Sequence, residues 1–227
     1  MGLQLIVKNA DFSAIRVGRL GLYTSITDGL VGLFGLTSLL ADPAINFANY
    51  AAPATIVGSP VQALTGVTSG ASDYIDFGIV ATGARTVAVV VKNDISGVPY
   101  FSSFAAAPTY GEYIWSQGTD LRFESAKWAT PHPSVASSVR DEMVAARIEL
   151  GVGGSIYKPR TATLSSKADT GEQDWLTTYR TSVSSAGSAT TKAQLFAYWN
   201  RTLTTGELDT FYGEMQAQLL ALGIATI

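Results

Sequence analysis

Short runs rich in β-branched and aromatic residues, with apolar and polar positions alternating, recur along most of this 227-residue chain. The clearest run covers residues 86–92 (TVAVVVK). Clusters of turn-forming residues such as 116–120 (SQGTD) and 151–154 (GVGG) separate the runs. A period of two residues is typical of strands, and frequent turn signals favour short antiparallel connections. The sequence therefore predicts a many-stranded antiparallel fold.

The other expected strands cover residues 3–8, 74–79, 99–104, 112–116, 121–125, 143–150 and 195–201. Only one segment strongly indicates a helix, because its apolar residues recur at intervals of three and four. These residues are Leu208, Phe211, Tyr212, Met215, Leu219 and Leu220. Thr204 and Glu207 form a capping box at the start, and Gly223 stands where a C-terminal cap is expected. A second, shorter helical turn is expected over residues 135–142.

Hydrophobic residues make up 47% of the chain and charged residues 15%, a composition that excludes disorder. The net charge of −3 leaves no basic surface for a phosphate backbone, so we expect no nucleic-acid partner. The chain has no cysteine, which excludes disulfides and thiolate metal sites. No apolar run is long enough to span a membrane. The first residues lack the features of a signal peptide, so we expect synthesis in the cytoplasm.

Residues 43–72 contain no charged side chain. A surface exposed to water normally carries interspersed charges. We therefore expect part of this segment to be covered by other chains, and the protein to be a homo-oligomer.

Three stretches resemble the concanavalin A-like, laminin G-like jelly-roll family. Residues 71–78 (ASDYIDFG) and 84–92 (ARTVAVVVK) are similar to a pair of its strands. Residues 193–204 (AQLFAYWNRTLT), which lead into 207–212, resemble its closing strand and helix. Residues 29–36 (GLVGLFGL) are similar to its opening strand. The resemblance implies an all-β, antiparallel jelly-roll sandwich over residues 28–227, with a short C-terminal helix at about 204–222.

The closing strand supports this fold on physical grounds. Leu195, Ala197 and Trp199 share one face, while Phe196 and Tyr198 share the other. Since both faces are apolar, we expect this strand to be covered on both sides.

Residues 1–27 form an N-terminal strand or arm ahead of the jelly roll. This order resembles tailed-bacteriophage virion proteins that carry laminin G-like domains. The resemblance implies a non-enzymatic structural protein of the virion, as a capsid decoration or a component of the tail or a fibre. Its partners are then other virion proteins, and it resides in the virion after synthesis in the host cytoplasm.

No set of residues predicts catalysis. The only histidine, His132, stands between two prolines and is expected in an exposed loop. Glu207 and Asp209 fall in the first helical turn, where acidic residues complement the helix dipole. A further charged cluster of Arg140, Asp141, Glu142, Arg147 and Glu149 could hold a substrate, but a solvated turn leading into a half-exposed strand is favoured. We expect no enzyme activity.

No metal site or cofactor is expected either. Calcium requires converging oxygen ligands, and neither Asp73 with Asp76 nor Asn93 with Asp94 lies in a densely acidic loop.

The alternative to a structural role is a glycan-binding or receptor-binding module for host cell-surface polysaccharide. Sugar binding needs aromatic platforms and a few polar groups on loops. The candidate contacts are Tyr110, Tyr113, Trp128 and Trp175, in or beside expected loops. The alternative for each ring is a place in the core or in an interface, and this alternative is favoured.

Overall fold

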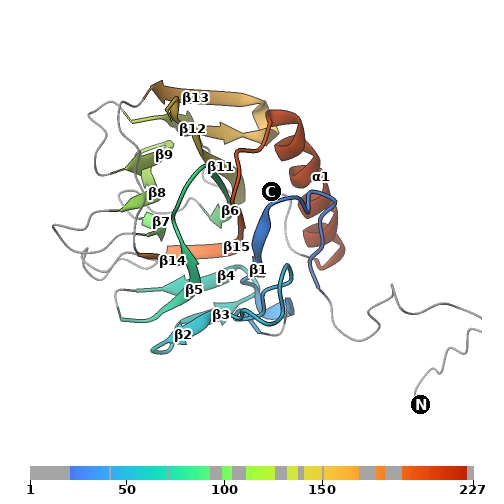
Figure 1. The fold of residues 1–227 in the computed structure, drawn as a ribbon. Helices are drawn as coiled ribbons and strands as arrows, with labels where there is room; N and C mark the ends of the chain where they lie inside the picture. The colour runs from blue at the N-terminus through green and yellow to red at the C-terminus, as the bar shows by residue number, and fades with distance from the viewer. Residues whose placement is uncertain are drawn as a thin grey trace, which may run out of the picture.

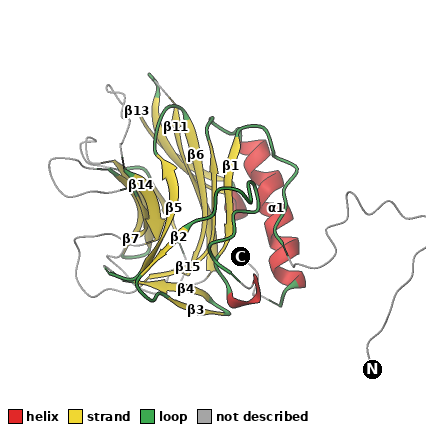
Figure 2. Ribbon diagram, turned by 60° about the horizontal axis from the view of Figure 1, so that its bottom comes forward, coloured by secondary structure: helices red, strands yellow, loops and turns green. Residues whose placement is uncertain are grey.

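Two antiparallel sheets stack face to face, and the one α-helix of the described residues covers the outside of one sheet (Figures 1 and 2). The computed structural model describes residues 21–40, 42–70, 72–92, 99–103, 111–125, 132–137, 141–149, 151–168, 177–181 and 191–223. The expected strand at residues 3–8 and most of the expected arm lie outside them.

The eight-stranded sheet has the order β13 (Thr163–Ala168), β12 (Gly153–Lys158), β11 (Asp141–Glu149), β6 (Arg85–Lys92), β15 (Thr191–Trp199), β4 (Gly66–Ser69) and β3 (Val61–Ala63), with β1 (Leu30–Gly35) also paired to β15. The seven-stranded sheet has the order β10 (Ser134–Ala136), β9 (Asp120–Ser125), β8 (Glu112–Gln117), β7 (Pro99–Ser102), β14 (Thr178–Thr181), β5 (Tyr74–Val80) and β2 (Thr55–Val57). Short 3₁₀ turns are η1 (Ser38–Leu40) and η2 (Pro159–Thr161).

The connections cross repeatedly between the sheets. Strands β4 to β7 lie in alternate sheets, and so do β13 to β15. This connectivity is typical of a jelly-roll sandwich. The all-β fold expected from the sequence is therefore confirmed, together with its C-terminal helix.

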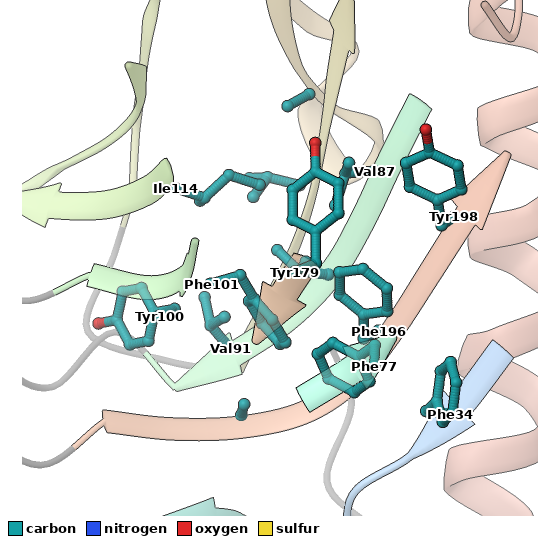
Figure 3. Close-up of a cluster of buried hydrophobic side chains, with 14 of the residues drawn as sticks. Phe34, Phe77, Val87, Val91, Tyr100, Phe101, Ile114, Tyr179, Phe196 and Tyr198 are labelled. Atoms are coloured by element: carbon teal, nitrogen blue, oxygen red, sulfur yellow. The ribbon is translucent and has the colours of Figure 1, made fainter. Parts of the chain in front are cut away.

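The main core lies between the sheets (Figure 3). At its centre the rings of Phe77 and Phe196 stack with their centroids 4.0 Å apart. Phe34, Phe101 and Tyr179 surround this pair. Because the rings come from both sheets, their burial holds the two sheets together.

A second core lies between the eight-stranded sheet and α1 (Thr205–Ala221). The rings of Trp199 and Phe211 meet edge to face at 4.9 Å, and Trp199 Nε1 donates to the carbonyl of Ile26. Leu195 and Ala197 also belong to this core, while Phe196 and Tyr198 belong to the main one. The prediction that β15 is covered on both faces is confirmed.

The helix begins as the sequence predicts. Thr204 is the N-cap, and its hydroxyl accepts a hydrogen bond from the backbone N–H of Glu207, which completes the capping box. Gly223 follows the helix with φ 76°, a left-handed conformation that ends helices.

The segment before β1 packs on this helix. Glu214 accepts hydrogen bonds from the Thr24 hydroxyl at 2.6 Å and the Ser25 N–H at 3.0 Å, and Leu22 is buried. The placing of a domain boundary at residue 27 stays a prediction.

The helical turn expected over residues 135–142 is wrong. Val135 lies in β10 and pairs with β9, while Asp141 begins β11 and pairs with β6. Pairing with strands distant in sequence overrides the short helical spacing here.

Gly66 permits a close approach between two strands. Its φ is 111°, and a Cβ atom there would lie 2.3 Å from the carbonyl oxygen of Ala193 in β15. Glycine therefore allows the β3–β4 hairpin to join the sheet beside β15.

The sandwich has two different edges. β13 and β10 end the sheets at one edge, where the Ser134 N–H donates to the Ser165 hydroxyl at 3.2 Å. β3 and β2 end them at the other edge, joined by residues 58–60. Among the described residues, no helix has the length and apolarity needed to cross a membrane.

Candidate functional site

Tyr113 is the one sugar-contact candidate that the structure describes. Along β8 the residues Glu112, Ile114 and Ser116 are buried, whereas Tyr113 and Trp115 are partly exposed on the outward face of the seven-stranded sheet. Their rings meet at 61° with centroids 6.1 Å apart. The strand alternation thus places two aromatic rings on the outward face of the seven-stranded sheet. The other candidates, Tyr110, Trp128 and Trp175, lie outside the described residues.

The neighbouring strand β9 adds charged partners to these rings. Glu124 is opposite Tyr113, and Arg122 is opposite Trp115. The Arg122 guanidinium carbon lies 6.0 Å from the Trp115 ring centroid, within the range of a cation–π contact. Burial raises the pKa of Tyr113, as does its hydrogen bond to Glu124. The phenol therefore stays protonated at neutral pH.

His132 joins this group from the segment before β10. Its Nε2 lies 3.4 Å from Glu124 Oε1, and its side chain is only 7% exposed. His132 lies in a loop as expected, but the expectation that it is exposed is wrong, because it lies against Glu124. Burial lowers the pKa of His132 more than Glu124 raises it, and Lys167 and Arg122 lower it further. The imidazole is therefore mainly neutral at pH 7.

Three nitrogen atoms of this group are buried without a hydrogen-bond partner among the described residues. They are Trp115 Nε1, Arg122 Nε and His132 Nδ1. The first two can only donate. If His132 Nε2 carries the proton that faces Glu124, then Nδ1 is an acceptor. The protein encloses these three atoms, so they lie in a polar interior beside the two rings.

A row of polar residues continues from this group across the sheet. The register pairs Glu124 with Tyr113, Tyr113 with Ser102, Ser102 with Arg180, and Arg180 with Asp76. At the far end, the Arg180 guanidinium carbon lies 5.1 Å from the ring centroid of Tyr74. Ser102 is fully buried, so the partly exposed polar residues lie at the two ends of this row, each end beside an aromatic ring.

The carboxylates weighed as catalytic groups have structural partners. Glu207 bonds to Arg201 at 2.6 Å and to the Thr204 N–H, while Asp209 accepts from the Tyr157 hydroxyl at 2.7 Å. Arg201 and the cap hydrogen bonds lower the pKa of Glu207 to about 2.

The expectation that Glu142 belongs to a solvated turn is wrong. Its side chain is 1% exposed, and its carboxylate pairs with Lys158 at 2.7 Å and accepts from the Ser137 hydroxyl. These contacts join β11, β12 and the end of β10, because the strand places Glu142 toward the sandwich interior.

The two aspartates weighed as calcium ligands also have local partners. Asp73 accepts from the Ser59 N–H, and Asp76 accepts from the Gly78 N–H and the Thr178 hydroxyl. No group of three or more potential metal ligands occurs in the described part of the chain. Asn93 and Asp94 lie outside it.

A pocket that the sequence did not reveal lies at the β1 and β5 end of the sandwich. Its volume is about 350 Å³. Val31, Phe77, Ile79 and Val80 contribute apolar surface. The polar lining comes from Asn46, Asn49, Thr82, Tyr198 and Asn200. The asparagines in the uncharged segment 43–72 were the available signal, but their meeting with β5 and β15 depends on the tertiary fold.

A smaller pocket of about 270 Å³ lies at the opposite edge. It includes Arg147, Ser155 and Lys167. Arg147 is already held there, because its Nε donates to the Ser155 hydroxyl and its Nη1 to the Leu203 carbonyl.

No protein-family model matches the sequence, and no curated relative matches it. Among solved structures, the receptor binding domain of botulinum neurotoxin D is similar with a TM-score of 0.62 at 12% identity, over 84% of this chain and 54% of that chain. Trypanosoma rangeli sialidase in complex with sialic acid has a TM-score of 0.58 at 16% identity, over 81% of this chain and 32% of that chain. The chain thus spans about half or less of these proteins. At such identities the likeness establishes the fold alone, a two-sheet β-sandwich.

Proposed function

We propose that this protein is a non-enzymatic glycan-binding module, and that the outward face of the seven-stranded sheet contacts the glycan. The observation that carries this proposal is the partly exposed ring pair of Tyr113 and Trp115, with Arg122, Glu124 and His132 around it. Sugars stack their C–H faces on aromatic rings and exchange hydrogen bonds through hydroxyl groups.

The polar side chains around the ring pair suit a ligand that carries hydroxyl groups. A hydroxyl both donates and accepts, so it can accept from the Arg122 guanidinium, which is 29% exposed, or donate to the Glu124 carboxylate, which is 19% exposed.

Two similar solved structures add support from outside the chain. One is named as a receptor binding domain, and the other was solved in complex with sialic acid. The absence of catalysis is part of the proposal, and the structural partners of Glu142, Glu207 and Asp209 support it.

The test is binding of the purified protein to a broad glycan array and to host cells. We expect Trp115→Ala to weaken binding about tenfold, because ring stacking contributes about 0.5–1.5 kcal/mol. The matched control is Tyr23→Ala, since Tyr23 is 69% exposed and lies beside α1 on the other side of the sandwich. Wild-type protein that binds no glycan and no cells would contradict the proposal, as would equal binding by the folded Trp115→Ala variant.

A second candidate is assembly into a virion, as a capsid decoration, tail or fibre protein. The observation that favours it is the edge formed by β2 and β3, which belongs to the uncharged segment 43–72. Ile56, Val61 and Leu64 expose 46%, 65% and 58% of their surface there. Exposed sheet edges are usually protected by charges, so this edge suits pairing with a second copy or another virion protein.

Mass spectrometry of purified phage particles tests this second candidate. Hundreds of copies per particle support a decoration or tail-tube protein, and a few to a few dozen support a fibre. Absence from particles excludes the virion role and leaves glycan binding to be tested alone.

A further inference from the structure

We infer that the pocket at the β1 and β5 end is a second ligand site, which takes an uncharged sugar residue. It is separate from the outward face of the seven-stranded sheet, because none of Tyr113, Trp115 or Arg122 lines it. The inference therefore holds or fails independently of the proposed function.

The wall of the pocket is built before any ligand arrives. Asn46 is only 2% exposed, and its side chain joins the 46–52 loop to β1. Its Oδ1 accepts from the Leu33 N–H at 3.1 Å and the Ala48 N–H at 3.0 Å. Its Nδ2 donates to the carbonyls of Val31 and Ala52. The loop is therefore already held in place when a ligand binds, so binding does not incur the entropy cost of ordering it.

Three polar groups converge on the rim from separate segments. Asn49 comes from this loop, Thr82 follows β5, and Asn200 follows β15. All three residues are exposed. The amides and the hydroxyl both donate and accept, as the hydroxyl groups of a sugar require.

The apolar side of the pocket matches the C–H face of a sugar ring. Val31 and Val80 line it and expose 37% and 38% of their surface. Gly78 also lines the pocket, and a Cβ atom there would meet nothing within 4 Å. An apolar wall with a polar rim is complementary to a pyranose, which has apolar faces and polar edges.

The charge of the pocket decides between ligand classes. Among the described residues, no Asp, Glu, Lys, Arg or His side chain lines it. Arg201 follows Asn200 in the chain, but it pairs with Asp28 at 3.0 Å and Glu207 at 2.6 Å. A buried carboxylate or ammonium needs an opposite charge, so the pocket selects uncharged sugars over uronic acids and amino sugars.

The test is methyl-detected NMR on the full chain with labelled valine and isoleucine. The probes are the methyl glycosides of glucose, galactose, mannose and N-acetylglucosamine, with sodium glucuronate as the charged comparison. At least one neutral glycoside is expected to shift the Val31, Ile79 and Val80 methyl signals with a Kd on the order of millimolar, as is usual for a small polar ligand. Glucuronate is expected to shift them at least about tenfold more weakly.

Ala52→Trp blocks the pocket, because Ala52 is an exposed lining residue. We expect this variant to abolish the shifts. Ala51→Trp is the matched control, since Ala51 is also exposed and does not line the pocket. Asn200→Ala should weaken binding about three- to tenfold through a lost hydrogen bond. Trp115→Ala should leave pocket binding unchanged.

Three results would overturn the inference. The first is the absence of shifts at Val31 and Val80 with every neutral glycoside. The second is the same binding by Ala51→Trp and Ala52→Trp. The third is glucuronate binding as tight as that of the neutral probes. Loss of array binding by Trp115→Ala concerns only the outward face, so failure of either site is recognised separately.

Discussion

At the scale of single residues, the ion pair between Arg85 and Glu112 is the most buried one between the two sheets among the described residues. Arg85 belongs to β6 and Glu112 to β8, and both side chains are 1% exposed. Arg85 Nε and Nη2 donate to the two carboxylate oxygens at 3.0 and 2.7 Å. Arg85 Nη1 also donates to the carbonyl of Gly83 at 2.6 Å. The bidentate geometry compensates both charges inside the sandwich.

We predict that Arg85→Met lowers the free energy of unfolding by about 3–5 kcal/mol, because it leaves the Glu112 carboxylate buried without its counter-ion. The double variant Arg85→Met, Glu112→Leu should recover most of this loss. Urea denaturation measures both. The control is Asp120→Asn, since Asp120 is 4.0 Å from Arg122 at the surface and should change stability by less than about 0.5 kcal/mol. A loss below about 1 kcal/mol for Arg85→Met would show that water reaches Glu112.

The environments of single charged residues could not be predicted from the sequence. His132 and Glu142 both stand beside turn-like residues, which favours exposure. In the structure, His132 lies against Glu124, and Glu142 pairs with Lys158. Burial here depends on strands brought together by the fold, and the local sequence holds no signal for it. Tyr113 could be placed beside a turn, but its partners Arg122 and Glu124 depend on the register of β8 and β9.

At the scale of elements, α1 was predictable because its signals are local. The capping box needs only Thr204 and Glu207, and the apolar positions Leu208, Phe211 and Met215 are buried as their spacing predicts. The strands expected near β5, β6, β8 and β9 were also confirmed, since alternation depends on neighbouring residues. The short segment 135–142 was misassigned because pairing with distant strands decided its conformation.

The start of α1 also predicts a dependence of stability on pH. The pKa of Glu207 is about 2 in the folded protein, well below its ordinary value of 4.5, mainly because of Arg201. Because the pKa of Glu207 is lowered in the folded protein, its carboxylate stabilises the folded state at pH values above about 4.5. This stabilisation is lost as the pH falls from about 4.5 to 2. Glu207→Gln should therefore cost about 1–2 kcal/mol at pH 7, and little near pH 2.

Thermal unfolding of wild type and Glu207→Gln between pH 7 and 2 measures this difference. Gln also completes a capping box, so the variant removes the charge and keeps the cap. Glu149 is exposed, so Glu149→Gln serves as the control. The difference in stability between this variant and wild type should stay the same from pH 7 to pH 2. A constant difference between wild type and Glu207→Gln over the whole pH range would contradict the assigned role of Arg201.

At the scale of the whole molecule, the order of the strands is the part that one sequence could not supply. The lack of charge in residues 43–72 was visible, but its place at one edge of both sheets was not. Because of that placement, the two edges of the eight-stranded sheet differ in charge. β13 at one edge carries Lys167, whereas β3 at the other carries no charge and exposes Val61.

This asymmetry predicts self-association through the β3 edge. A twofold axis would pair β3 with β3 of a second copy in an antiparallel manner, extending the sheet without bringing like charges together. Val61→Lys places two ammonium groups close to that axis, so we expect it to weaken the dimer at least tenfold. Analytical ultracentrifugation over a concentration series measures the change. Leu164→Lys is the matched control, because Leu164 is 48% exposed on β13 and should leave the dimer unchanged. A wild-type chain that stays monomeric at hundreds of micromolar, or equal weakening by both variants, would exclude pairing through β3.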